Sequence, residues 1–167
     1  MLGQMTRSNN VSPRQSGFTL IETMVVVSIA SIAAALAAPN IMLMYARYEL
    51  YQATTTFHNQ LLFARSAAIT RNAMIVATPV NLPTGQGQVT FTAPLGSEAF
   101  PPSVGFVLPL PPQPIGFTSR GLSTTPLATQ TIQLQSLRNP NLVYSVSLAP
   151  SGKVTWCSVA VTPCIKN

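Results

Sequence analysis

The sequence predicts an α+β protein, in which one long N-terminal helix packs its second half on an antiparallel β-sheet domain. Two patterns predict the helix. Residues 18–38 are apolar with Glu22 as their single charged residue, and the stretch that follows places apolar residues at helical spacing. A third pattern predicts the sheet, because the chain from Ala73 onward consists of short apolar runs separated by proline and glycine.

The apolar stretch from Phe18 to Ala38 is long enough to cross a membrane. It contains 21 residues, and a helix of that length spans about 30 Å, the thickness of the hydrocarbon core of a bilayer. The residues before it include Arg7 and Arg14 and no acidic residue, which predicts a cytoplasmic N-terminus by the positive-inside rule. A charge inside the bilayer costs about 3 kcal/mol, so Glu22 is a candidate functional residue.

The helix is expected to continue after Pro39 to about Arg71 as an amphipathic helix. Apolar side chains recur there at steps of three and four residues, which places them on one face: Leu50, Ala53, Phe57, Leu61, Ala64 and Ala68. This one-sided pattern predicts that the second half of the helix covers the sheet. His58 lies next to the stripe and is expected to be a partly exposed polar residue without a catalytic role.

The strands are expected to be short. The candidate strands are residues 74–78, 88–93, 104–108, 115–118, 131–137, 142–148 and 153–161. Pro79 is expected to end the first of them, because proline cannot donate a hydrogen bond to a ladder. In the 142–148 run, Ser145 and Ser147 alternate with apolar residues, which predicts a half-buried strand. The last two runs flank Pro150-Ser151-Gly152, which predicts a hairpin.

The segment Gly17-Phe18-Thr19-Leu20-Ile21-Glu22 resembles the prepilin peptidase site of type IV pilins and type II secretion pseudopilins. The resemblance implies cleavage after Gly17 and methylation of Phe18 as the new N-terminus. It also implies that Glu22 pairs with the amino terminus of a neighbouring subunit and thereby sets the register of assembly. Pro39 lies where such pilins often carry a helix-kinking proline. The implied partners are other pilin or pseudopilin subunits, the prepilin peptidase and the inner membrane.

The same resemblance divides the chain into four expected parts. Residues 1–17 are a prepilin leader, 18–39 a transmembrane or filament-core helix, 40–72 its amphipathic second half, and 73–167 a β-rich periplasmic domain. The leader carries no apolar run of its own, unlike a secretory signal peptide. The expected location is the inner membrane, crossed once, with the C-terminal domain in the periplasm or in an extracellular filament.

A second, weaker resemblance narrows the family and its role. The segments Gly116–Gly121 and Ser147–Val154, together with helix residues Leu61–Arg71, are similar to the GspH/FimT group of minor pilins and pseudopilins. In that group a phenylalanine precedes a glycine turn, and a late hairpin closes the sheet. The resemblance implies a pilin-like fold and a structural subunit of a type IV pilus or a type II secretion pseudopilus.

Two alternative functions stay open. The first is a DNA-binding minor pilin for natural transformation, a function reported within the FimT-like group. The formal net charge of +6 would suit DNA, but it arises mainly because the chain has only three acidic residues. The candidate nucleic-acid contacts are scattered along the sequence: Arg120, Arg138, Lys153 and Lys166. The second alternative is a membrane-anchored periplasmic protein that never polymerises.

The composition disfavours catalysis and metal binding. The chain has three glutamates, one histidine and no aspartate, and no two of these residues are spaced for acid–base catalysis. No metal, including calcium, and no cofactor is expected, since too few ligand-type residues are available. Cys157 and Cys164 are expected to form a disulfide, because the compartment beyond an inner-membrane anchor is oxidising.

Overall fold

The computed structural model describes residues 17–93, 95–107, 113–161 and 163–164. The chain forms two compact units, Met1–Pro39 and Asn40–Asn167. Helix α1 (Leu20–Thr70) supplies the described helical part of the first unit and the first element of the second. Its bounds agree within two residues with the helix expected from the apolar stretch and the amphipathic stripe.

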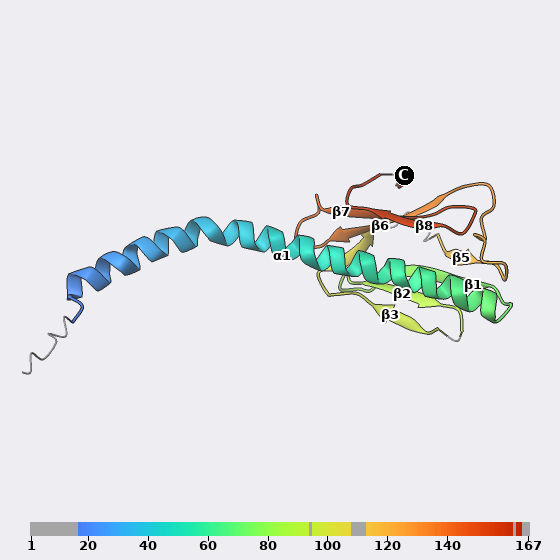
Figure 1. Cartoon of the computed structure of the whole chain (residues 1–167), viewed down its shortest axis with the longest axis horizontal. Helices are drawn as coiled ribbons and strands as arrows, with labels where there is room; N and C mark the ends of the chain where they lie inside the picture. Colours follow the sequence, from blue (N-terminus) through green and yellow to red (C-terminus); the bar gives the residue numbers. More distant parts are fainter. Residues whose placement is uncertain (1–16, 94, 108–112, 162, 165–167) are drawn as a thin grey trace, which may run out of the picture. The chain divides into compact units, whose positions relative to one another are not determined.

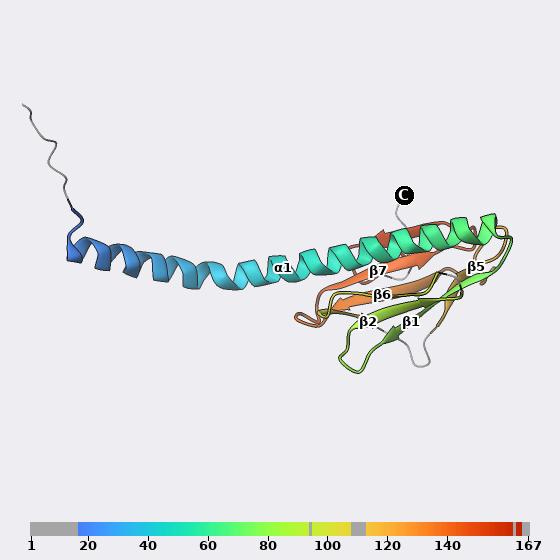
Figure 2. The ribbon, with the colours of Figure 1, turned by 90° about the horizontal axis from the view of Figure 1, so that it is seen from below.

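The second unit consists of the second half of α1 and two four-stranded antiparallel sheets, as Figures 1 and 2 show. The strands are β1 (Ile75–Asn81), β2 (Gly87–Phe91), β3 (Ser97–Ala99), β4 (Val104–Val107), β5 (Ile115–Phe117), β6 (Gln130–Ser136), β7 (Val143–Leu148) and β8 (Val154–Cys157). We call the sheet of order β3-β2-β1-β5 sheet A and the sheet of order β4-β6-β7-β8 sheet B. The expected hairpin is confirmed, because β7 and β8 pair with Leu148 opposite Val154.

The core lies between the helix and the two sheets. All six residues of the predicted apolar stripe are buried, which confirms that this half of α1 covers the sheet. Phe57 lies at the centre, where its ring meets those of Phe100 and Phe106 edge to face at centroid distances of 6.0 and 5.7 Å. Removing a buried aromatic ring such as this costs about 3–5 kcal/mol.

The prediction that Pro79 ends the first strand is wrong, because β1 continues through it to Asn81. Pro79 lies opposite Val89 of β2, and the Thr92 N–H bonds the carbonyl of Val76. In the alternating antiparallel pattern, the nitrogen of Pro79 therefore points away from β2. On that side β5 pairs only with residues 75–77 of β1. The proline consequently interrupts no ladder.

Strand β3 was not predicted from the sequence. Its three residues, Ser97–Ala99, are all exposed and show no apolar alternation. The strand forms where the chain returns to β2, with Gly96 at φ 75° and its carbonyl accepting a hydrogen bond from the Phe91 N–H. It is an edge strand of sheet A.

The outer face of sheet B is covered by the C-terminal segment, so the prediction of a half-buried β7 is wrong. Ser145 and Ser147 are 0% and 1% exposed. The Ser145 hydroxyl donates to the Val159 carbonyl and accepts from the Val161 N–H, and the Ser147 hydroxyl accepts from the Cys164 N–H. The segment is joined to β8 by the disulfide between Cys157 and Cys164. Strand β8 accordingly ends at Cys157 and does not reach Val161.

Candidate assembly site

Thr19 caps the start of α1 and places Glu22 in its first turn. The Glu22 N–H donates to the Thr19 hydroxyl oxygen at 3.3 Å, and the Thr23 N–H donates to the Thr19 carbonyl at 3.2 Å. A threonine cap followed three residues later by glutamate has the spacing of a capping box. A negative charge is also favourable at a helix N-terminus. This cap was not predicted from the sequence, although the Thr-x-x-Glu spacing signals it.

The first unit exposes an apolar surface. Every residue from Gly17 to Leu36 is exposed, including Phe18 at 79% and Ile32 at 64%. Its hydroxyl groups are satisfied within the helix, since Ser28 donates to the Met24 carbonyl and Ser31 to the Ser28 carbonyl. A helix whose hydroxyl groups are bonded within it and that exposes apolar side chains all round is suited to lipid or to other apolar helices.

A helix that spans a membrane must be both long enough and apolar enough. Within the described residues, no single helix meets both criteria, whereas Leu20–Leu36 and Asn40–Thr70 meet them together as a bent pair. The backbone is helical through Pro39, and the kink expected there stays a prediction. A Cβ atom added at Gly17 would meet no atom within 4 Å, so packing within the described chain does not require glycine at the expected cleavage position.

Arg65 connects the end of the helix to two loops of the second unit. Its Nε donates to the Gly121 carbonyl at 3.0 Å, and its Nη2 donates to the Ser151 carbonyl at 3.5 Å. Gly121 and Gly152 both have positive φ, at 74° and 80°. Gly121 ends one of the two segments that resemble the GspH/FimT group, and Gly152 lies in the other. Their spacing in the sequence did not predict that they meet in the fold.

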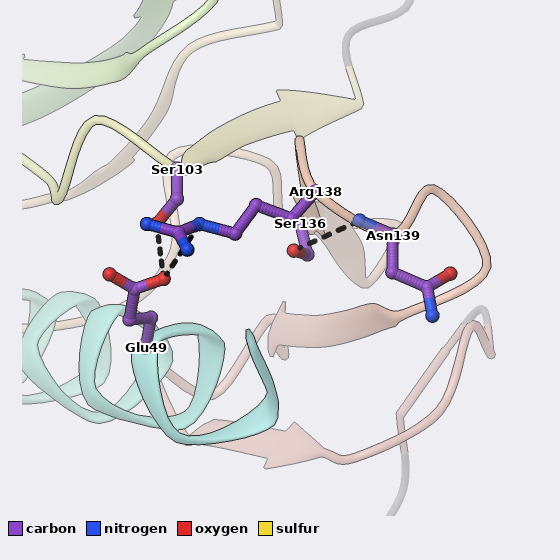
Figure 3. A network of polar contacts seen from close by, with 5 residues as sticks. All are labelled: Glu49, Ser103, Ser136, Arg138 and Asn139. Carbon is purple, nitrogen blue, oxygen red and sulfur yellow. Dashed lines mark hydrogen bonds and ion pairs between the residues drawn. The ribbon is translucent and has the colours of Figure 1, made fainter. Parts of the chain in front are cut away.

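A polar network fastens the other end of the domain to α1 (Figure 3). The Ser103 hydroxyl donates to Glu49 Oε2 at 2.7 Å, and Arg138 Nε lies 3.5 Å from the same oxygen. The guanidinium of Arg138 also lies over the ring of Tyr45, 5.2 Å from its centroid. The Glu49 side chain is only 12% exposed, so this pair is less screened by solvent than an ordinary surface pair. The β6–β7 loop is thereby fixed to the helix.

The four candidate nucleic-acid residues do not form one patch. Arg120 and Lys153 are neighbours in sequence of Gly121 and Gly152, which approach each other beside Arg65. Arg138 instead contacts Glu49, 16 residues before Arg65 on α1 and therefore about 24 Å away along the helix. Lys166 lies outside the described residues. No three His, Cys, Asp or Glu residues in the described ranges gather where they could hold a metal ion.

Comparison with known proteins gives a motif and a fold. The family model for the prokaryotic N-terminal methylation motif matches residues 12–38. No curated protein matches the chain. The chain is similar to two crystal structures of the type IV minor pilin FimU of Pseudomonas aeruginosa. Their TM-scores are 0.55 and 0.53, at 17% and 16% identity, covering 71% and 69% of this chain and 95% and 98% of theirs.

A third solved structure is the minor pseudopilin EpsH from the type 2 secretion system of Vibrio cholerae, with a TM-score of 0.48 at 19% identity, covering 66% of this chain and 97% of that one. The likeness to FimU confirms the predicted fold class, a long N-terminal helix packed on antiparallel β-sheets.

Proposed function

We propose that this chain, which carries the N-terminal motif and the fold of the type IV pilin and pseudopilin family, is a minor pilin or pseudopilin. It would serve as a structural subunit of a type IV pilus or of a type II secretion pseudopilus. The observation that carries the proposal is the exposed apolar helix from Leu20 to Leu36, attached to a second unit that already has a complete core. A surface of this kind on such a unit is suited to assembly.

In the proposed mechanism, prepilin peptidase cuts after Gly17 and Phe18 becomes a methylated amino terminus. The apolar helix then remains in the inner membrane, with the second unit on the periplasmic side. The assembly machine later transfers the helix into the filament. The transfer exchanges lipid for neighbouring helices, and both surroundings are apolar. The hydrophobic gain is therefore small, so the contact between Glu22 and an amino terminus can decide whether and where the subunit joins.

Processing and incorporation are tested together on filaments sheared from cells. We expect mass spectrometry of the incorporated chain to find an N-terminus at Phe18 that is heavier than the unmodified residue by one CH2 unit, because a methyl group replaces a hydrogen atom. Replacing Gly17 with a bulky residue should leave the uncleaved chain in the membrane fraction, while Gly17→Ala should still be cut. A chain that begins at Met1 in cells with active peptidase would contradict the proposed processing. A cleaved chain that never appears in filaments would favour the anchored protein that does not polymerise.

A second candidate function, DNA binding by a minor pilin, has one observation in its favour. The approach of Gly152 to Gly121 brings the loops that carry the exposed Arg120 and Lys153 together at one end of the second unit. Clustered cations of this kind bind phosphate groups with strong salt dependence. If this function holds, the double variant Arg120→Ala, Lys153→Ala should abolish a gel shift of duplex DNA at 50 mM salt, while Arg138→Ala should leave it nearly unchanged. An equal loss in both variants would contradict a patch at this end.

A further inference from the structure

A groove runs between the second half of α1 and the edge strand β3, because residues of both elements line it. It consists of two hollows of about 370 and 220 Å³. The first is lined by helix residues including Gln52 and Thr56 and by the chain from Glu98 to Pro101. The second is lined by Gln60, Phe63, Phe91, Leu95 and Glu98. Glu98 lines both, so the two hollows adjoin at this residue.

The groove offers a carboxylate in a domain that is otherwise basic. From Asn40 onward the chain has seven lysine and arginine residues and two glutamates, and Glu49 is paired with Arg138. Glu98 is exposed, and among the described residues no ion pair or side-chain hydrogen bond engages its carboxylate. Gln60 also lines the second hollow, and its Oε1 atom is buried and has no hydrogen-bond partner in the described part of the chain.

The second hollow also has an apolar wall suited to a flat cation. Phe63 is 64% exposed, although it is a large aromatic residue on a helix that is otherwise packed against a sheet. A guanidinium can stack on an aromatic face while its N–H groups donate to a carboxylate, whereas an ammonium is a compact point charge that suits this combination less well. Glu98 and Phe63 line the same hollow, and this pairing favours arginine over lysine.

The open edge of β3 gives the groove a second way to hold a protein segment. Hydrogen bonds from the Phe100 N–H to the Gly87 carbonyl and from the Phe91 N–H to the Gly96 carbonyl flank the pairing of Glu98 with Val89. In the antiparallel alternation, the backbone groups of Ser97 and Ala99 therefore point away from β2. Unpaired edge groups of this kind can bond an extended segment of another chain.

We propose that this groove receives an arginine side chain of a neighbouring subunit, with the guanidinium donating to Glu98 and stacking on Phe63. The inference rests on the proposed function, because it names a contact between subunits of the assembled filament. The chemistry of the groove selects the partner: a subunit with a basic surface, as this chain itself has in the exposed Arg71 and Arg120. A charge-assisted contact at a partly enclosed site adds selectivity to the association of the apolar helices.

The test places a photo-crosslinking amino acid at Thr56, an exposed residue that lines the groove, in the full chain in filament-producing cells. A second position, Leu127, which is 95% exposed and lies outside the groove, serves as the control. We expect an adduct with another subunit from position 56, whose crosslinked peptide contains an arginine. We also expect Glu98→Gln to lower its yield about tenfold, as loss of a charge-assisted contact would, while Glu98→Asp retains most of it.

Recovery of the chain in sheared filaments is measured in the same cells. This measurement distinguishes failure of the proposed function from failure of the groove inference alone. If the chain with intact Glu98 is absent from filaments, the proposed function fails and the groove inference fails with it. If the chain is present but the adduct from position 56 is missing, or is equally strong in Glu98→Gln, the groove inference alone is overturned. An adduct yield that falls equally at positions 56 and 127 also overturns it, because the loss is then not local to the groove.

Discussion

Gly152→Ala is expected to destabilise the second unit by about 3 kcal/mol, through two separate costs. Gly152 has a φ of 80°, which a residue with a side chain adopts only at a cost in energy. In addition, an added Cβ would lie 1.9 Å from the Gly121 carbonyl oxygen and 3.2 Å from Arg65 Nε. The obstacle is backbone, so it cannot move aside as the end of a flexible side chain would. The hairpin turn would have to separate from the loop to which Arg65 joins it.

The matched control is Gly96→Ala, which isolates the cost of the backbone conformation. Gly96 has a φ of 75°, but an added Cβ there would meet no atom within 4 Å. We expect this variant to lose only about 1 kcal/mol. Unfolding can be followed in the full chain in detergent by the fluorescence of Trp156, the single tryptophan, which stacks on Tyr144. We expect midpoints that differ by roughly 8 °C. Equal midpoints would show that Gly152 and Gly121 are not in close contact.

The helix and its buried face could be predicted because their signals are local. The stripe from Leu50 to Ala68 repeats with the period of a helix and is buried throughout. The β7–β8 hairpin was predictable for the same reason, since a turn sequence separates two alternating runs. Features that depend on residues far apart in the sequence left weaker signals. Pro79 stays in a strand only because β5 ends before reaching it, and Ser145 is buried only because a later segment crosses it.

The residues of the candidate site were likewise predictable only where their signal is local in the sequence. The segment from Gly17 to Glu22 was recognisable because the motif lies in six consecutive residues, and the motif model matches the same region. The basic residues could not be grouped from the sequence. The loops that carry Arg120 and Lys153 come together at one end of the domain only because Gly121 and Gly152 approach each other in the fold. Arg138 was a candidate for DNA contact by composition alone, and the structure instead pairs it with Glu49. Its partner is 89 residues earlier in the chain, beyond the reach of any local pattern.

Glu22→Gln is expected to reduce recovery of the chain in sheared filaments by about tenfold or more, while leaving the second unit as stable as before. The reason is that a carboxylate can pair with a charged amino terminus in an apolar filament core, and a neutral amide cannot neutralise that charge. Glutamine can still serve at this position of a capping box, so the start of α1 should keep its geometry. The substitution therefore removes the charge and leaves the backbone bond from Glu22 to Thr19 in place.

The complementary variant, Thr19→Val, removes the capping hydroxyl and retains the charge. We expect it to fray the first turn and to lower filament recovery less than Glu22→Gln does, because the carboxylate remains available to a neighbour.

Membrane insertion, cleavage after Gly17 and the unfolding midpoint reported by Trp156 should be unchanged in Glu22→Gln, which excludes a general folding defect. If Thr19→Val has the larger effect, the cap that Thr19 provides matters more for assembly than the charge of Glu22. If Glu22→Gln joins filaments as well as the unaltered chain, the proposed pairing with an amino terminus is wrong, and Glu22 serves another step, such as recognition by the methylating enzyme.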